Sequence, residues 1–314
     1  MELIYPASIY LSMNISLSSF LQKQQRAQTK ARHEYFNVFK KSKAELQQYM
    51  KLPEEKWKIL DFGCGYYYPQ VLFFSREGFD IQGVDIISDF YRQELSQSTN
   101  IPLGCVRRLK KRINWKIYDW SMLRIYFQCI ESLSGIREKD FNYRVHSYDG
   151  TTLPFRDGEF NVIISNSVLE SVKDVQNTAS ELRRVIQKGG VINLSWKNFY
   201  SFSGNIRSFK TNKRNPWGHL RGELNDGINL NRMRPEKVRE IFSRYFKSNN
   251  LYYRDINHFI VPMETDIEFS LCTENPHLFE WEMKKTLFSN RKELLEKYPE
   301  NLLLSRGFKL IGQA

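Results

Sequence analysis

Two acidic residues and a pair of glycines have the types and the spacing to hold a nucleoside. Asp61 ends a short apolar run and is followed by the turn Gly63-Cys64-Gly65, and Asp85 ends a second apolar run about twenty residues further on. Glycine lets the backbone come close to a ligand, and a carboxylate can accept hydrogen bonds from two ribose hydroxyls. The pattern predicts two parallel strands joined by a crossover helix, with a nucleoside-bearing cofactor across their carboxyl ends.

The rest of the chain alternates between strand and helix patterns, which is typical of an α/β fold. Residues 21–50 are polar and contain no Gly or Pro, so they predict a helical lead. Apolar residues on one face from Val175 to Ile186 predict a helix that Gly189 and Gly190 end. The predicted strands complete a seven-strand plan and cover residues 57–62, 80–85, 143–146, 159–165, 191–196, 251–259 and 308–312.

Composition limits the class of protein. The 314 residues suffice for one large α/β domain with insertions or for two small domains, and 41% hydrophobic residues can bury a substantial core. Lys and Arg exceed Asp and Glu by 47 to 35, and the resulting charge of +12 favours polyanions or an anionic membrane surface as partners. The four cysteines lie far apart, so we expect no disulfide framework and no metal site, and a reducing cytoplasm. No apolar run reaches the length of about eighteen residues that predicts a transmembrane helix.

The segment between the second and third predicted strands is long for one crossover connection. It predicts an inserted helical cap over residues 95–140, with basic residues from Arg107 to Arg112 followed by several aromatic ones. Basic residues interleaved with aromatic residues can follow a nucleic-acid backbone, face anionic lipid, or bind a phosphate-bearing carrier such as a lipid-linked sugar. They can equally form a solvated helix face, and the sequence leaves these readings open.

Four motifs occur in register with the predicted strands. They are Asp61-Phe62-Gly63-Cys64-Gly65, Tyr148-Asp149-Gly150-Thr151-Thr152-Leu153-Pro154-Phe155, Ser165-Asn166-Ser167-Val168-Leu169-Glu170 and Arg184-Val185-Ile186-Gln187-Lys188-Gly189-Gly190. Together they resemble the class I S-adenosylmethionine-dependent methyltransferases, specifically the small-molecule, type 11-like group with a D-x-x-x-L-P-F segment. The resemblance covers residues 57–196 and extends more weakly to the last predicted strand. It implies a Rossmann-like, seven-stranded methyltransferase sheet with flanking helices and S-adenosylmethionine as the cofactor.

The resemblance also implies roles for individual residues. Asp61 and the glycine turn would receive the methionine end of the cofactor, and Asp85 the ribose diol. Asp149 would receive the adenine amino group, with the Gly150 backbone beside the ring, and Asn166 would touch the methionine portion. The implied cofactor-binding set is Asp61, Gly63, Cys64, Gly65, Asp85, Ile86, Asp149, Gly150 and Asn166.

Three positions depart from the pattern of this family. Tyr67 stands where the first motif has a third small residue, which also argues against a nicotinamide-dinucleotide site. Asn161 replaces an acid common in the fourth strand, and Ser171 replaces a histidine that often follows it. The last change removes one candidate base, but it does not affect the residues implied for cofactor binding.

Residues after the fifth predicted strand should determine the acceptor. In the segment 197–230 a tryptophan offers a flat apolar wall, a histidine a base and an arginine an anion clamp. The candidates are Trp217, His219 as the tentative catalytic base, and Arg221, with Tyr200 lining the acceptor pocket. This segment is similar to methyltransferases of cell-surface glycan and polysaccharide assembly. A merely structural histidine is the alternative for His219.

The sequence therefore predicts a helical lead, residues 1–55, and a methyltransferase domain, residues 56–314. The cap at 95–140 and the acceptor-side elements at 197–230 and 262–300 are insertions within it. We expect a cytoplasmic enzyme that methylates an oxygen of a small-molecule or glycan acceptor. Peripheral membrane association and a phosphate- or lipid-linked acceptor stay open. The alternatives are an RNA-modifying methyltransferase, favoured by the positive charge but lacking an appended RNA-binding module, and a cofactor-binding scaffold without activity.

Overall fold

The structure is a computed structural model that describes residues 25, 27–86, 120–135, 144–202, 204, 214–223, 232–254, 276–305 and 307–314. The basic cluster from Arg107 to Arg112 and most of the expected cap lie outside the described residues. So does the end of the strand expected at 251–259.

The described strands form one mixed sheet in the order β3-β2-β1-β4-β5-β7-β6. Four pairings are parallel, β3 with β2, β2 with β1, β1 with β4 and β4 with β5, whereas β7 runs antiparallel to both of its neighbours. The expected α/β, Rossmann-like fold is confirmed. The bounds are β1 Lys58–Phe62, β2 Asp80–Asp85, β3 Val145–Ser147, β4 Phe160–Asn166, β5 Ile186–Lys197, β6 Lys247–Arg254 and β7 Gly307–Gln313.

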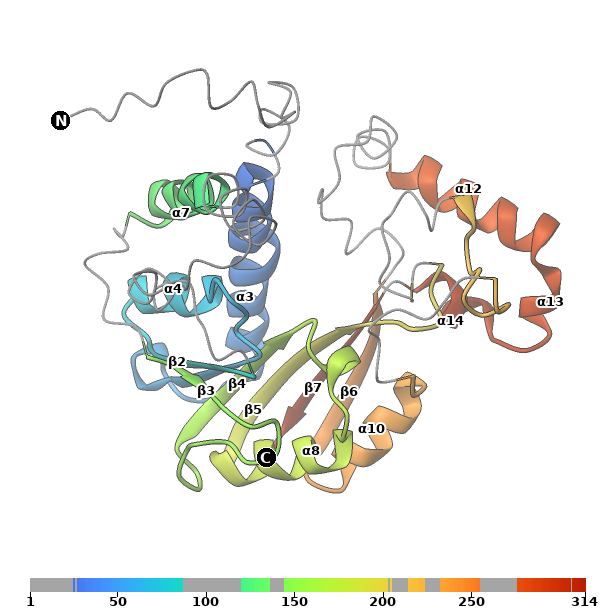
Figure 1. Ribbon diagram of the computed structural model, residues 1–314. Coiled ribbons are helices and arrows are strands. Elements are labelled where there is room, and N and C mark those ends of the chain that lie inside the picture. The colour runs from blue at the N-terminus through green and yellow to red at the C-terminus, as the bar shows by residue number, and fades with distance from the viewer. Residues whose placement is uncertain are drawn as a thin grey trace, which may run out of the picture.

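Helices cover both faces of this sheet, and a further group lies to one side (Figure 1). One face carries η1 Glu34–Phe39, α3 Lys40–Tyr49, α4 Pro69–Arg76 and α7 Trp120–Ser134. The other face carries η5 Leu169–Ser171, α8 Val175–Val185 and α10 Pro235–Ser243. The group to one side contains α12 Pro276–Asn290, α13 Lys292–Leu295 and α14 Glu300–Leu304, and the short η2 Glu54–Lys56 precedes β1.

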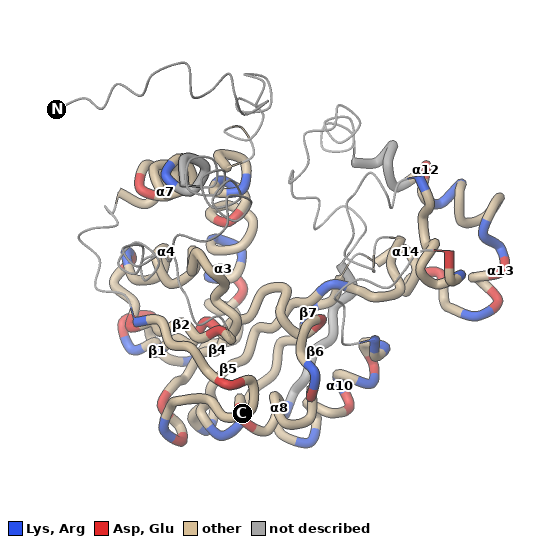
Figure 2. The backbone as a smooth tube through the Cα atoms, viewed as in Figure 1, with Lys and Arg blue, Asp and Glu red and all other residues tan. Residues whose placement is uncertain are grey.

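The strands supply apolar side chains to two separate cores. In β1, Ile59 belongs to the cluster under α3 and α4, whereas Leu60 and Phe62 belong to the cluster over α8 and α10. Successive side chains of a strand point to opposite faces, so a strand covered on both sides is apolar throughout. Charged residues accordingly lie mainly on the helices and loops around the sheet (Figure 2).

The topology brings the motif residues to one edge. β1 lies between β2 and β4, with Asp61 in register with Gly83 on one side and Ile164 on the other. All three strands run in the same direction, so the residues that follow them meet at their common carboxyl edge. The chain order reverses between β1 and β4, which is where ligands bind in open α/β sheets.

The part of the expected cap that the structure describes is α7. This helix contacts α4, and its residues Tyr126, Phe127 and Ile130 are buried in the same cluster as η1 and α3. One face of α7 thus packs onto the helices that cover this side of the sheet (Figure 1).

The fifth strand begins earlier than the sequence indicates. The helix α8 ends at Val185 and β5 begins at Ile186, so Gly189 and Gly190 lie inside the strand and do not end a helix. Pairing with β4 is irregular here, and a Cβ on Gly190 would lie 2.8 Å from the carbonyl oxygen of Asn161. Glycine is therefore needed for close approach of two strands.

We predict that the side chain of Asn161 stabilises the start of β1. Its Oδ1 accepts a hydrogen bond from the Lys58 amide at 2.9 Å, and its Nδ2 donates to the Lys56 carbonyl at 2.8 Å. Asn161→Ala removes both hydrogen bonds and should lower the free energy of unfolding by about 1–3 kcal/mol, measured by urea denaturation. Asn161→Asp keeps an acceptor but no donor, so it should also destabilise. Unchanged midpoints in both variants would contradict this role.

Candidate functional site

The turn after β1 is held by two glycines in left-handed conformations. Gly63 has φ +75° and Gly65 has φ +71°. The amides of Gly63 and Cys64 both donate to the Val84 carbonyl, at 2.7 and 3.1 Å, and this fixes the turn against β2. A Cβ on Gly63 would lie 2.1 Å from Cγ2 of Val168, whereas a Cβ on Gly65 would meet nothing within 4 Å. Gly63 is thus required for packing, and Gly65 faces open space.

Asp85 joins the ends of the first two strands. Its Oδ2 accepts a hydrogen bond from the Gly65 amide at 2.9 Å. This bond orients the carboxylate at the end of β2 and holds the glycine turn beside it. The arrangement suits a carboxylate that receives ribose hydroxyls next to a turn that a ligand can approach closely.

Asp61 is a buried acid that lacks a full set of partners. Its side chain is 2% exposed, and Oδ2 has no hydrogen-bond partner among the described residues. Burial raises the pKa of Asp61 well above its usual value, and the nearby Glu34 and Asp85 raise it further. A buried carboxylate beside two others is unfavourable without a compensating cation or donor. The position therefore suits the ammonium group of an amino acid.

Glu34 was not among the residues that the sequence indicated. It lies at the start of η1, and its Oε2 accepts a hydrogen bond from Nε2 of Gln70 at 3.1 Å. Gln70 lies in the first turn of α4, directly after the glycine turn. Burial is the main cause that raises the pKa of Glu34. No motif marks either residue, because their proximity depends on how the N-terminal helices pack.

Ile86 and Gly150 lie together on the adenine side of the implied site. Ile86 is 65% exposed although it is apolar, and a Cβ on Gly150 would meet only Cγ2 of Ile86, at 3.8 Å. An exposed apolar side chain beside a glycine at φ +86° leaves room for a flat ring. The two residues are therefore brought together as the resemblance implies.

Asp149 is held in a turn of its own. Its Oδ1 accepts hydrogen bonds from the amide and hydroxyl of Thr151, at 2.8 and 2.7 Å, and from the Thr152 amide at 3.0 Å. These donors lower the pKa of Asp149 to about 2, so the carboxylate is ionised at neutral pH. An ionised carboxylate only accepts, which matches the amino group of adenine.

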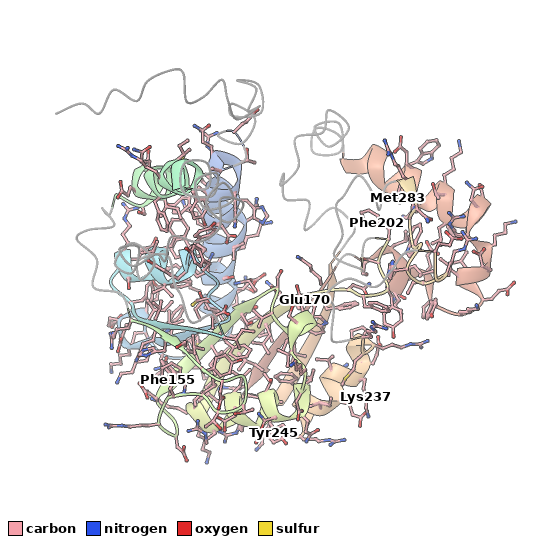
Figure 3. All side chains as sticks on the ribbon, viewed as in Figure 1. Phe155, Glu170, Phe202, Lys237, Tyr245 and Met283 are labelled. Carbon is pink, nitrogen blue, oxygen red and sulfur yellow. The ribbon has the colours of Figure 1, made fainter. Side chains whose placement is uncertain are left out.

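The end of β4 is tied to the end of β5. Oδ1 of Asn166 accepts a hydrogen bond from the Ser195 hydroxyl at 3.1 Å, and Ser167 adopts φ +59° while its amide donates to the Ser195 carbonyl. Glu170, 2% exposed, accepts from the Lys197 amide at 3.3 Å. Figure 3 shows Glu170 at the edge of the sheet, separate from the helices to the side. Ser167 is thus a non-glycine residue in a left-handed conformation at the sheet edge, and such strained residues are common at functional sites.

The acceptor candidates do not all lie with the cofactor candidates. Trp217 is fully buried in a third cluster with Phe202 and Met283, which Figure 3 labels, and its Nε1 donates to the Leu303 carbonyl at 3.3 Å. This packing gives Trp217 a structural role in place of the open wall that we expected.

His219 and Arg221 have partners within the same region. Nε2 of His219 lies 2.7 Å from the Phe199 carbonyl, so this nitrogen carries the hydrogen. Arg221 forms ion pairs with Glu223 at 2.8 Å and with Glu293 at 3.1 Å, so the expected anion clamp is already bound to two carboxylates. Tyr200 is half-buried, and its hydroxyl donates to the Arg232 carbonyl at 2.8 Å.

Comparison with known proteins gives one family match. Residues 130–194, which run from α7 to β5 and include Asp149, Gly150 and Asn166, match the family model described as "Methyltransferase domain". No curated protein sequence matches the chain.

Several solved structures are similar at low identity. An S-adenosylmethionine-dependent methyltransferase from Archaeoglobus fulgidus is 14% identical, with a TM-score of 0.45 over 90% of this chain and 97% of that one. A putative sarcosine dimethylglycine methyltransferase from Galdieria sulphuraria is 13% identical, with a TM-score of 0.45 over 88% and 84%. Phosphoethanolamine N-methyltransferase 2 from Haemonchus contortus, in complex with S-adenosylmethionine, is 13% identical, with a TM-score of 0.41 over 95% and 60%.

The family match and the geometry of the edge point to the same activity. The matched segment carries the strand-end residues implied for adenine and methionine, and the open turn at Gly65 and the buried carboxylate of Asp61 lie at the same edge. Together they support methyltransferase activity with S-adenosylmethionine as the cofactor.

We predict that alanine at Gly65 blocks the cofactor without unfolding the protein. A left-handed conformation costs a non-glycine residue about 1–2 kcal/mol. No atom lies within 4 Å of the new methyl group, so only a ligand would meet it. Gly65→Ala should lower the affinity for S-adenosylmethionine by about tenfold or more in calorimetry. Gly189→Ala is the matched control, because Gly189 has φ +81° and equally open surroundings away from this edge. Equal affinities in the two variants would rule out a ligand at Gly65.

We predict that Asp61→Asn stabilises the ligand-free protein and weakens cofactor binding. Because the pKa of Asp61 is raised on folding, the folded state holds this proton more tightly than the unfolded state does. The stabilisation by the protonated Asp61 side chain is therefore lost as the pH rises above about 3.9, the pKa of an aspartate in the unfolded chain, towards its higher pKa in the folded protein. The variant should melt at a higher temperature than the parent at pH 8, and the difference should shrink towards pH 5. A difference that does not change with pH would contradict the assignment.

Proposed function

We propose that this chain transfers a methyl group from S-adenosylmethionine to an oxygen atom of a small-molecule or glycan acceptor. The observation that carries the cofactor half of this proposal is the unsatisfied, buried carboxylate of Asp61 beside a glycine turn that is open at Gly65. When bound, the cofactor supplies an electrophilic methyl group on a cationic sulfur.

Each strand end has its own role in the proposal. Asp61 and the turn from Gly63 through Cys64 to Gly65 hold the amino-acid end, and Asp85 holds the ribose. Ile86 and Gly150 enclose the adenine ring, and Asp149 accepts its amino hydrogen. Asn166 borders the methionine portion at the end of β4. In-line displacement at sulfur depends mainly on alignment and on exclusion of water, which rigid strand ends provide.

The acceptor side should lie over the other half of the same edge. Since β7 is antiparallel to both β5 and β6, those two strands run in the same direction. The helix α10 leads into the start of β6, so it begins near the edge where β5 ends. A pocket of about 410 Å³ lies there, and its lining is Arg234, Glu236, Lys237, Glu240, Pro299 and Leu302.

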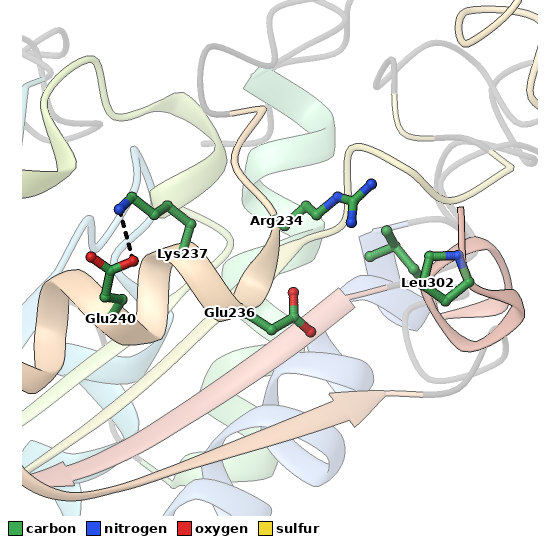
Figure 4. A pocket seen from close by; sticks show the side chains of 6 residues that line it. Arg234, Glu236, Lys237, Glu240 and Leu302 are labelled. Carbon is green, nitrogen blue, oxygen red and sulfur yellow. Dashed lines mark hydrogen bonds and ion pairs between the residues drawn. The ribbon is translucent and has the colours of Figure 1, made fainter. Parts of the chain in front are cut away.

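The lining of this pocket favours a polar, compact acceptor. Figure 4 shows Arg234, which directly precedes α10, and Glu236, in its first turn, on the side of Leu302, while Lys237 is paired with Glu240 at 2.7 Å. Tyr200 is close to the lining residue Arg234 through Tyr298. The Tyr200 ring lies 5.3 Å from that of Tyr298, and the Arg234 guanidinium lies 5.9 Å from the Tyr298 ring.

Two basic and two acidic side chains beside Pro299 and Leu302 suit a sugar or a small polar molecule. The lining carries no excess of positive charge, which a polyanion such as RNA would favour.

His219 is the proposed base for a hydroxyl acceptor. With the hydrogen on Nε2 engaged by the Phe199 carbonyl, Nδ1 is the nitrogen that can take up a proton.

The other parts of the proposal concern whole segments. The lead (1–55) precedes a methyltransferase domain (56–314), and the cap (95–140) and the acceptor-side elements (197–230 and 262–300) are insertions within that domain. We propose a cytoplasmic location. Within the described part of the chain, no helix combines the length and the apolar character that a membrane span requires.

Calorimetric titration with S-adenosylmethionine, S-adenosylhomocysteine and NAD tests the cofactor. We expect micromolar binding of the first two and none of NAD, because the edge lacks a third glycine for a dinucleotide pyrophosphate. Transfer of a radiolabelled methyl group to pools of glycans, small metabolites and RNA then identifies the acceptor class. Transfer to RNA would replace the proposed acceptor. Cofactor binding without transfer to any pool would favour a scaffold, and binding of none of the three would overturn the proposal.

We predict that His219→Gln lowers turnover by about a hundredfold, the usual contribution of a general base. Gln can still donate to the Phe199 carbonyl, so the melting temperature and the affinity for S-adenosylmethionine should be unchanged. Turnover with the accepting pool, thermal melting and calorimetry are measured on the same preparation. A large fall in melting temperature would show that His219 is structural, and unchanged turnover would remove it as the base.

A further inference from the structure

The helical lead brings two half-buried charged residues against the glycine turn. The ammonium of Lys30 lies 4.8 Å from the centre of the Tyr67 ring and 5.5 Å from that of Tyr126. Four residues further on, Glu34 bonds to Gln70 in the first turn of α4. Although Lys30 and Glu34 are spaced for an i,i+4 ion pair, the described structure contains no ion pair between them.

Three buried oxygen atoms around Glu34 have no hydrogen-bond partner among the described residues. They are Oδ2 of Asp61 in β1, Oε1 of Gln70 in α4 and the hydroxyl of Tyr126 in α7. All three side chains are at most 3% exposed.

Glu34 is close to each of them, since it bonds to Gln70 and acts electrostatically on both Asp61 and Tyr126. Buried polar atoms are nearly always satisfied, so three such atoms around one residue indicate a missing polar ligand.

The charges around these three oxygen atoms match an amino-acid zwitterion. Asp61 and Glu34 supply two carboxylates, and Lys30 supplies a cation at the aromatic rings of Tyr67 and Tyr126. Buried charges are stable only when they are paired and hydrogen-bonded. A ligand that brings both an ammonium and a carboxylate would meet both signs at once, with its ammonium towards the two carboxylates and its carboxylate towards Lys30.

We propose that Glu34 and Lys30 are specificity-determining residues that recognise the amino-acid end of the cofactor, Glu34 its ammonium and Lys30 its carboxylate. This inference rests on the proposed function, since it takes S-adenosylmethionine as the cofactor. It assigns recognition to the lead, which the strand-end motifs do not include. The lead then acts as the wall that closes the methionine end, with Gln70 and Tyr126 supplying further hydrogen bonds.

Three probes separate this role from a structural one. S-adenosylmethionine and S-adenosylhomocysteine both carry the amino-acid end, whereas 5′-methylthioadenosine lacks it and keeps the adenosine. Calorimetry is run with all three on the full chain and on Glu34→Gln, which keeps the size and the hydrogen bond to Gln70. Glu45→Gln is the matched control, because Glu45 lies in the same lead but bonds to Asn193 and Lys309 over β5 and β7.

We expect Glu34→Gln to weaken binding of S-adenosylmethionine and S-adenosylhomocysteine by about tenfold or more, as for loss of a charge-assisted hydrogen bond. Binding of 5′-methylthioadenosine should not change, and Glu45→Gln should not alter any of the three. Lys30→Met, which keeps an apolar stem over Tyr67 and Tyr126, should show the same selective loss. This second variant tests the inference independently if Glu34→Gln does not fold.

Equal weakening of all three probes would show that Glu34 only supports the turn, and no weakening would show that it does not touch the ligand. Either result overturns the inference while the proposed function stands. If the parent protein binds none of the three probes, the proposed function itself fails.

Discussion

The hydrogen bond from the Gly65 amide to the Asp85 carboxylate joins the ends of two neighbouring parallel strands. Through this bond the turn after β1 is fixed against β2, and the open side of Gly65 comes to lie beside a carboxylate. The remaining groups of the edge take their positions from the same two strands: Asp61 precedes the turn, Ile86 follows Asp85, and β3 pairs with β2. A local backbone contact therefore determines how a whole row of side chains from distant parts of the chain is presented.

The edge is electrostatically costly when it is empty. Burial raises the pKa values of Asp61 and Glu34, which shows that their ionised forms are disfavoured where they lie. The two apolar clusters on the faces of the sheet must offset this cost, and their size explains how the fold tolerates it. Unfavourable groups gathered at one edge of a well-packed sheet are typical of a site whose ligand completes the structure.

How well the sequence predicted the structure depended on the range of each contact. Asp61, Gly65 and Asp85 lie at the strand ends where the sequence placed them, because strand ends and glycine turns are local patterns. The sequence did not indicate that Glu34 lies near them, because it reaches the edge only through packing of the lead.

The start of β5 was misplaced because a Gly-Gly pair usually ends a helix, whereas here Gly190 permits close approach of β4. Trp217 was read as a wall for a ligand, and its burial follows from the third cluster, which no periodicity in the sequence reveals.

The pairing of Glu45 in α3 with Lys309 in β7 spans 264 positions of the chain, and Glu45 also accepts a hydrogen bond from Asn193 in β5. Glu45 therefore anchors α3, which follows the residues that carry Lys30 and Glu34, to two neighbouring strands that lie far along the chain. The place of Glu34 at the edge thus depends on the far half of the sheet as well as on the packing of the lead itself.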